Sequence, residues 1–217
     1  MTSNGIHVRS LSSAELPAHL DAVAALRIAV FRGWPYLYEG DVGYERDYLS
    51  VYADSADSVV VLACDGERVV GASTGLPLAD DAPAFRVPFE AAGIDPAQVF
   101  YLGESVLLPE YRGRGVGHAF FDHREAHARA LGRFTTTAFC AVDRAGDDPR
   151  RPAGHRDNAA FWQGRGYTRR SGMTMQLPWR EVGEAEERMH ALTFWTRTEG
   201  GVTDAAHRAV AGGESAR

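Results

Sequence analysis

The stretch Tyr111-Arg112-Gly113-Arg114-Gly115-Val116-Gly117 decides the expected fold. It follows an apolar segment at 98–108 and precedes an amphipathic stretch at 118–131. This order predicts a strand, a glycine-rich turn and a helix. Glycine lets the backbone approach a ligand closely, and the free N–H groups at a helix start converge on anions. The stretch therefore predicts a phosphate-binding loop, to which the two arginines add positive charge.

The loop has three other interpretations: a plain surface turn and two nucleotide-binding motifs. A surface turn with two solvated arginines needs no ligand. The dinucleotide fingerprint requires a third glycine where His118 stands, and a mononucleotide P-loop ends in Gly-Lys-Ser/Thr, whereas the sequence contains no lysine. Both common nucleotide motifs are therefore disfavoured.

The loop resembles the acyl-coenzyme A signature of the GNAT superfamily of N-acetyltransferases, Gln/Arg-x-x-Gly-x-Gly/Ala, through Arg112, Gly115 and Gly117. The resemblance implies that residues 112–117 lie beneath the coenzyme's pyrophosphate. It also implies that the preceding strand runs along the pantetheine arm. The residues expected to line that arm are Val106, Leu107 and Leu108.

A second element, from Asn158 to Tyr167, resembles the family's pattern of an asparagine, an aromatic pair and Gly-Phe/Tyr. The resemblance implies that Asn158 contacts the cofactor. In the family the second aromatic is often a tyrosine that protonates the departing thiolate. Here Trp162 stands in that place and has no usable acidic proton. The remaining candidates for the general acid, each without the expected spacing, are Tyr111, Cys140 and His155.

The order of periodic segments predicts an α/β (α+β) protein with a mixed, mostly antiparallel sheet of about seven strands flanked by helices. The resemblance implies that the sheet splays between its fourth and fifth strands, 98–108 and 134–142. Asp65-Gly66 predicts a hairpin. We expect one domain over 1–198 and a disordered tail over 199–217. The other expected strands are 6–11, 58–64, 68–76, 173–177 and 191–197, and the helices follow a capping box at 12–15 and lie at 42–52, 86–92, 118–131 and after Asn158.

The charged segment 178–187, between the last two expected strands, has the length of a lid, a homodimer contact or a short surface helix. The sequence leaves these alternatives open.

Composition limits the classes of function. The 217 residues are 45% hydrophobic and 24% charged, and the net charge is −6. This charge argues against nucleic acid as a partner. No segment has the pattern of a signal peptide or the length of a membrane span, so we expect a cytoplasmic protein without membrane contact. The two cysteines lack metal-site spacing, and no metal is expected.

The implied chemistry is direct attack of an amine on the acetyl thioester, with much of the barrier reduction supplied by proximity. A backbone N–H near Leu107 is the expected oxyanion donor. Glu104 is the candidate base, and the alternative is that it pairs with an arginine and only holds its strand.

The acceptor is expected at the aromatic and acidic segment 34–41, where Trp34, Tyr36 and Tyr38 suit a cation. The alternative is that these rings pack the helix junction while the nearby acids, Glu45 among them, form a solvated face.

Two functions follow from these residues. The first is transfer of an acetyl group from acetyl-CoA to a primary amine, carried by a small molecule or a peptide. The second is a catalytically weak acyl-CoA-binding sensor or scaffold, suggested by Trp162. The sequence identifies neither the acceptor nor the preferred acyl chain.

Overall fold

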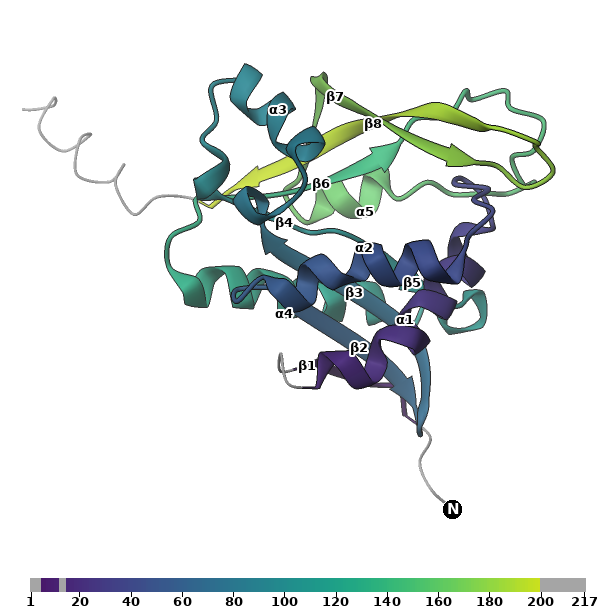
Figure 1. Ribbon diagram of the computed structural model, residues 1–217, viewed down its shortest axis with the longest axis horizontal. Helices are drawn as coiled ribbons and strands as arrows, with labels where there is room; N and C mark the ends of the chain where they lie inside the picture. The colour runs from purple at the N-terminus through teal and green to yellow at the C-terminus, as the bar shows by residue number, and fades with distance from the viewer. Residues whose placement is uncertain (1–4, 12–14, 200–217) are drawn as a thin grey trace, which may run out of the picture.

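A computed structural model describes residues 5–11 and 15–199 of the chain. One sheet of eight strands runs through the molecule in the order β1-β2-β3-β4-β6-β8-β7, and β5 pairs with β3 beside this path (Figure 1). All pairs are antiparallel except β4 with β6. The fold class predicted from the sequence is confirmed. The strands are β1 (His7–Leu11), β2 (Val59–Asp65), β3 (Arg68–Pro77), β4 (Val99–Tyr101), β5 (Ser105–Leu107), β6 (Thr136–Val142), β7 (Thr168–Arg180) and β8 (Glu187–Thr198).

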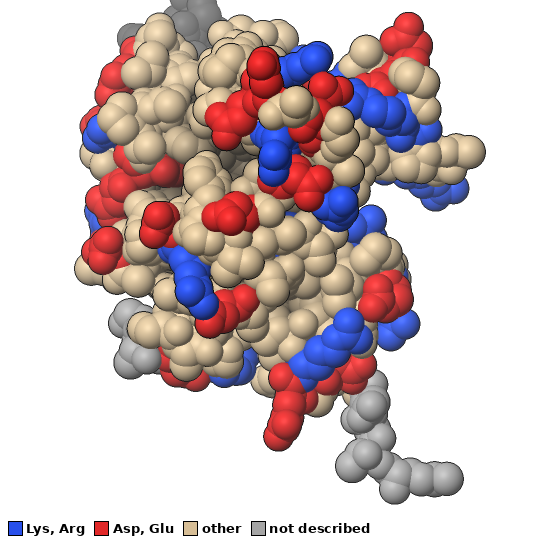
Figure 2. Space-filling view, turned by 45° about the vertical axis from the view of Figure 1, so that its right-hand side comes forward, with Lys and Arg blue, Asp and Glu red and all other residues tan. Residues whose placement is uncertain are grey.

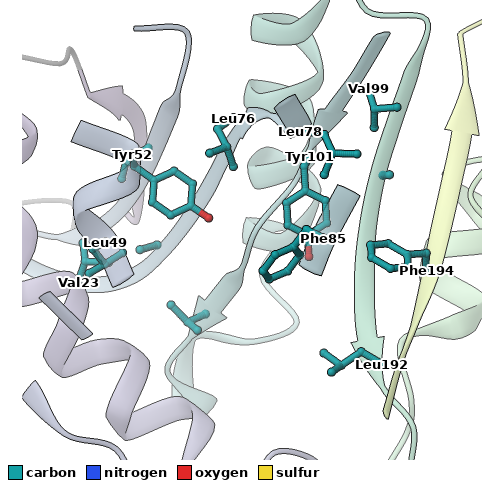
Figure 3. Packing of buried hydrophobic residues seen from close by; sticks show 14 of the residues in the cluster. Val23, Leu49, Tyr52, Leu76, Leu78, Phe85, Val99, Tyr101, Leu192 and Phe194 are labelled. Carbon is teal, nitrogen blue, oxygen red and sulfur yellow. The ribbon is translucent and has the colours of Figure 1, made fainter. Parts of the chain in front are cut away.

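Helices cover both faces of the sheet (Figure 1). One hydrophobic cluster lies under α1 (Leu16–Phe31), α2 (Val42–Asp54) and α3 (Pro83–Ala91). A second cluster lies under α4 (Val116–Leu131) and α5 (Ala159–Gly164). Figure 3 shows the first cluster, in which Val23 of α1 lies beside Leu49 of α2, and Phe85, Tyr101 and Phe194 gather from α3, β4 and β8.

The apolar sequence of β2 follows from the burial of both of its faces. Its residues Val59, Val61 and Ala63 pack into the second cluster, whereas Val60 and Leu62 pack into the first. Because side chains alternate across a strand, burial on both faces requires an uninterrupted apolar run. The predicted hairpin from β2 to β3 is confirmed, with Asp65 paired to Arg68 around Gly66.

The expected strand 98–108 is wrong as one element, because the structure divides it into β4 and β5. Strand β4 pairs in parallel with β6 from Val99↔Thr136 to Tyr101↔Ala138, and β5 then pairs with β3 instead. The break needs Gly103, since an added Cβ there would lie 2.1 Å from the hydroxyl oxygen of Tyr52. The expected splay between the strand 98–108 and the strand at 134–142 is thereby confirmed.

The short surface helix considered for 178–187 is wrong. Strands β7 and β8 form a hairpin that is paired as far as Arg180 and Glu187, which leaves a turn at 181–186. The imidazole of His190 stacks on the indole of Trp179 with ring centroids 3.7 Å apart. This cross-strand pair stabilises the end of the hairpin, where the polar sequence does not show the pattern of a strand.

Parts of the expectations lie outside the described residues. These are Ser12, Ser13 and Ala14 of the predicted capping box, and the predicted tail from residue 200 onward. Within the described ranges, none of the helices has the length and apolar character needed to cross a membrane.

Candidate active site

A cleft of about 1190 Å³ opens where β5 separates from β6. Its walls include Ser105 and Leu107 from β5 and residues 139–142 from β6. The cleft also brings together most of the site residues predicted from the sequence. The predicted cofactor residues in the lining are Leu107, Arg112, Gly117, Asn158 and Trp162, and the predicted catalytic and acceptor residues in it are Glu104, Trp34, Tyr36 and Tyr38.

The side chain of Val106 does not face the cleft. It is fully buried in the first hydrophobic cluster, because alternation along β5 directs Ser105 and Leu107 to the opposite face. Leu108 packs against both clusters. Gly113, Arg114, Gly115 and Val116 also lie outside the cleft lining, so what the loop offers to a ligand is backbone at the start of α4.

The glycine-rich loop has the geometry of an anion site. Gly115 is the N-cap of α4 with φ of 81°, a conformation that side-chain-bearing residues rarely adopt, and an added Cβ would meet no atom within 4 Å. The N–H groups of the first helical turn therefore remain open to a ligand. Arg112 and Arg114 donate to the carbonyl oxygens of Leu107 and Glu110 and form no ion pair with a carboxylate among the described residues.

Strand β5 offers peptide groups to the cleft. The carbonyl of Glu104 accepts from the N–H of Thr74, and the N–H of Leu108 donates to Val70, so these even-numbered positions face β3. The peptide groups of Ser105 and Leu107 must then point the other way, toward the gap between β5 and β6.

Helix α5 begins directly after Asn158, as expected. The carboxylate of Asp157 accepts from the N–H of Ala159 at 2.9 Å, and Gly166 follows the C-cap with φ of 85°. Asn158 is exposed and its side chain makes no capping bond. The ring of Trp162 packs edge-on against Phe139 and Trp195, with centroids 5.0 and 5.1 Å away.

The three weaker general-acid candidates occupy different places. Tyr111 lies outside the cleft lining and donates to Asp65 at 2.8 Å. Cys140 lines the cleft with its sulfur 3.0 Å from the Tyr101 hydroxyl, and burial raises the pKa of the Cys140 thiol to about 12. His155 lines the cleft edge-on to Trp34, with ring centroids 6.1 Å apart.

Three buried charged side chains, from α1, α2 and the position just before β5, contact one another beside the cleft. Arg27 of α1 contacts Glu104 at 2.5 Å and also pairs with Glu45 of α2. Glu45 has no exposed surface, so its expected place on a solvated face is wrong. Tyr48 donates to Glu104 at 3.3 Å, and its ring lies 4.1 Å from the Arg27 guanidinium. We call Arg27, Glu45 and Glu104 the charge triad.

The charge triad carries one excess negative charge. Burial alone would lower the pKa of Arg27, but the two carboxylates and Tyr48 outweigh it and raise the pKa well above the ordinary value. One oxygen of Glu45 and one of Glu104 have no hydrogen-bond partner among the described residues. A buried acid pair with one shared cation makes this part of the cleft favourable for a positive charge.

The aromatic segment before α2 both packs and faces the cleft. Tyr36 lies between Phe31 and Trp179, at centroid distances of 4.5 and 5.9 Å. Arg144 fixes the segment by donating to the carbonyl oxygens of Pro35 and Tyr36 at 2.6 and 2.9 Å. Burial, together with the neighbouring Glu45, raises the pKa of Tyr38, so its hydroxyl stays protonated.

Sequence reasoning missed Arg27, the role of Glu45, and Arg124. The side chain of Arg124 is 1% exposed on the core face of α4 and donates to the carbonyl oxygens of Thr74 and Glu104, both at 3.1 Å. A signal for it exists, because Arg124 stands midway between the buried residues Phe120 and Ala128 at helical spacing. An arginine in the middle of an apolar stripe indicates a buried side chain that forms hydrogen bonds inside the protein.

The described residues contain no group of three or more His, Cys, Asp or Glu side chains able to hold a metal ion. Acidic and basic side chains are interspersed on the face shown in Figure 2. That face therefore presents no broad basic patch.

A family model described as the Acetyltransferase (GNAT) family matches residues 24–151, more than half of the chain. A sequence search of curated proteins finds no significant match. Among solved structures, Arabidopsis thaliana NAA60 in complex with acetyl-CoA is similar at 13% identity and a TM-score of 0.59, over 91% of this chain and 100% of that one.

Two bacterial structures show the same likeness. A ribosomal-protein-alanine N-acetyltransferase from Brucella melitensis has 17% identity and a TM-score of 0.54, over 89% of this chain and 99% of that one. The putative acetyltransferase yncA from Salmonella typhimurium with its cofactor acetyl-CoA has 15% identity and a TM-score of 0.53, over 93% and 99%. At these identities the likeness concerns the fold.

Proposed function

Since the chain belongs to the GNAT family of acetyltransferases, we propose that it moves an acetyl group from acetyl-CoA to a primary amine by direct attack. One observation carries the proposal. A single cleft joins an anion-binding helix start and an open strand edge to a buried, negatively charged cluster. We call the first part, formed by β5, the loop 111–117, α4 and α5, the donor side. The second part, formed by α1, α2, the segment 34–38 and Glu104, is the acceptor side.

The residues of the donor side fit a coenzyme A phosphate. Residues 112–117 would hold the pyrophosphate through the open N–H groups of α4, and the outward peptide groups of β5 would pair with the pantetheine arm. Arg151 and Arg156 also line the cleft near Asn158, and no carboxylate among the described residues pairs with either. Guanidinium groups without a carboxylate partner at the cleft wall suit a polyanionic donor.

The chemistry requires a neutral amine. After the acceptor ammonium loses a proton, its nitrogen attacks the thioester carbonyl carbon, the C–N bond forms and the C–S bond breaks. The departing thiolate then takes a proton from a thiol, a hydroxyl or water. The N–H of Ser105 or Leu107 is directed toward the gap and would stabilise the negative carbonyl oxygen in the transition state.

Glu104 is the proposed base on the acceptor side. One of its oxygens contacts Arg27 and Tyr48, which leaves the other without a partner. The alternative, that Glu104 only pairs with Arg27 and holds its strand, predicts a different result on substitution. If Glu104 is the base, Glu104→Gln lowers kcat by about 100-fold or more and removes the acid limb of the pH–rate profile. An unchanged profile with a good amine contradicts the role.

The acceptor is proposed to be a cationic amine, since the charge triad has an excess negative charge beside aromatic rings. The Brucella melitensis structure bears the name of an enzyme that acts on an alanine of a ribosomal protein. A panel of small amines and of peptides with free amino groups therefore separates the two acceptor classes. The cytoplasm, as a source of acetyl-CoA, is the proposed location.

The second candidate is an acyl-CoA-binding sensor, favoured by Trp162 in the place of an acidic hydroxyl. Calorimetric titration with acetyl-CoA, followed by a thiol-release assay over the amine panel, distinguishes the candidates. Binding with turnover supports the transferase, and binding without turnover on the whole panel supports the sensor. Absence of binding contradicts both.

A further inference from the structure

Arg124 is a buried cation at the point where β4 and β5 separate, and the reaction proposed above gives it no role. All three of its nitrogens donate: Nε to Phe120 at 3.2 Å, Nη1 to Thr74 and Glu104, and Nη2 to the Ser105 hydroxyl at 2.9 Å. No carboxylate among the described residues forms an ion pair with it. Burial lowers the pKa of Arg124 to about 10, so it remains charged at neutral pH.

A purely structural task does not require this charge. A neutral amide side chain can donate hydrogen bonds to carbonyl groups with a smaller desolvation cost than a guanidinium without an anionic partner. The positive charge is therefore the feature that needs an explanation.

The orientation of one peptide group supplies it. The C=O and N–H of a trans peptide point in opposite directions. The carbonyl of Glu104 faces β3, where it accepts from the Thr74 N–H and from Arg124, both at 3.1 Å. The N–H of the same peptide belongs to Ser105 and so points away from β3, toward the gap beside β6. Ser105 is exposed and lines the cleft.

We infer that Arg124 is a positioning residue that polarises the Glu104–Ser105 peptide, so that the Ser105 N–H donates strongly to the thioester carbonyl oxygen of the acyl donor. A cation on the carbonyl side of a peptide strengthens the donor on its other side, as in any polarised hydrogen-bond chain. The effect grows as negative charge develops on the thioester oxygen, which is the condition for catalysis rather than binding. This inference rests on the proposed function.

The surroundings fix the peptide in place. Tyr52 and Thr74 close on Gly103, where an added Cβ would lie 2.1 and 2.6 Å from their oxygens. On the other side, Arg124 holds the Ser105 hydroxyl. The donor is thus oriented before the substrate arrives, which avoids a reorganisation cost during the reaction.

The test is isotope-edited infrared spectroscopy of acetyl-CoA labelled with ¹³C at the thioester carbonyl, bound to the wild type, to Arg124→Gln and to the control Arg129→Gln. Arg129 lies on the same helix and is exposed. In the wild type and the control we expect the carbonyl band below its position in water. In Arg124→Gln we expect the band to return toward that position and kcat to fall about 10-fold, less than the loss of a whole oxyanion donor.

Affinity separates polarisation from simple damage. Coenzyme A lacks the acetyl carbonyl, so we expect its Kd for Arg124→Gln to stay within about twofold of the wild-type value. The Kd of acetyl-CoA is expected to rise by more than that of coenzyme A. A merely structural role changes both affinities equally and leaves the band where it was.

Each failure has its own signature. A wild type that binds no acetyl-CoA contradicts the proposed function. A wild type that binds acetyl-CoA and acetylates an amine, but whose carbonyl band is unshifted or identical in Arg124→Gln, contradicts only the role of Arg124.

If Arg124→Gln does not fold, Arg124→Lys replaces it, because the shorter side chain cannot reach Thr74, Glu104 and Ser105 together. Its band is then expected part of the way back toward water, and a band identical to the wild type overturns the inference.

Discussion

The proposed donor side of the cleft consists mainly of backbone groups, whereas the proposed acceptor side is built from buried side chains. On the proposed donor side, Gly115 and the first turn of α4 are neighbours in the sequence, and their N–H groups would hold the coenzyme phosphate. On the acceptor side, Arg27, Glu45 and Glu104 come from three separate segments and meet only after folding. A backbone site can be recognised from a short motif, while a charge cluster depends on the whole topology.

The largest expected effect breaks the acceptor side. Arg27→Met leaves Glu45 and Glu104 buried without their shared cation, and we expect the free energy of unfolding to fall by about 3–5 kcal/mol. Urea denaturation measures this loss. Arg32→Met, which removes an exposed ion pair with Glu39, is the matched control with an expected change below about 1 kcal/mol. Equal effects of the two substitutions would show that the charge triad contributes no more than a surface pair.

The donor side is broken by Gly115→Val. A β-branched residue opposes the positive φ, at a cost on the order of 1–3 kcal/mol. Because the loop can relax when no ligand is bound, we expect most of this cost as a Kd for acetyl-CoA raised about 10- to 100-fold. Calorimetry measures the Kd. Gly172→Val, at a position with open space and no positive φ, is the control. Unchanged affinity in Gly115→Val would remove the loop from the coenzyme site.

A pH-dependent test of the charges around the acceptor side uses Asp81, because burial and the negative charge of Glu104 both raise the pKa of Asp81. Burial raises the pKa of Asp81 to about 6, above its ordinary value, so the folded state binds more protons than the unfolded chain between about pH 4 and 6. The free energy of unfolding therefore falls as pH rises through that window. We expect Asp81→Asn to be about 1–2 kcal/mol more stable than the wild type at pH 8, and equal to it near pH 4. A constant difference across this range would contradict the assignment.

The smallest expected effect concerns the helix that carries Glu45. Asp41 caps α2 by accepting from the Tyr44 N–H at 2.9 Å, so Asp41→Ala should cost about 1 kcal/mol in thermal or urea unfolding. Asp47→Ala, on the exposed face of α2, serves as the control. If the two variants lose the same stability, the cap does not hold this helix in place.

The sequence predicted what is local in the chain. The loop at 112–117 and the Asp65-Gly66 hairpin each combine neighbouring residues whose conformational preferences agree. The family resemblance added the splayed sheet and the pairing of two distant motifs. Both kinds of inference rest on local motifs at the proposed donor side, whereas the charge triad of the proposed acceptor side has no such motif.

The sequence could not predict what depends on distant contacts. The break at Gly103 is imposed by Tyr52 and Thr74, from other elements. In the β7–β8 hairpin, periodicity predicts only 173–177 and 191–197 as strands, because the remaining parts of β7 and β8 carry many polar and charged side chains. Glu45 looked solvated because its sequence neighbours are exposed acids and a tyrosine, and only the position of Arg27 explains its burial.

The sequence contains no lysine, so arginine supplies the permanent positive charges that line the cleft. A guanidinium stays protonated and is not a nucleophile at physiological pH, unlike the lysine ammonium, which can lose its proton. An activated thioester held in this cleft would therefore meet permanent positive charge but no lysine amine of the protein itself. Neither the cleft nor the rest of the sequence offers a lysine side chain that a bound thioester could acetylate.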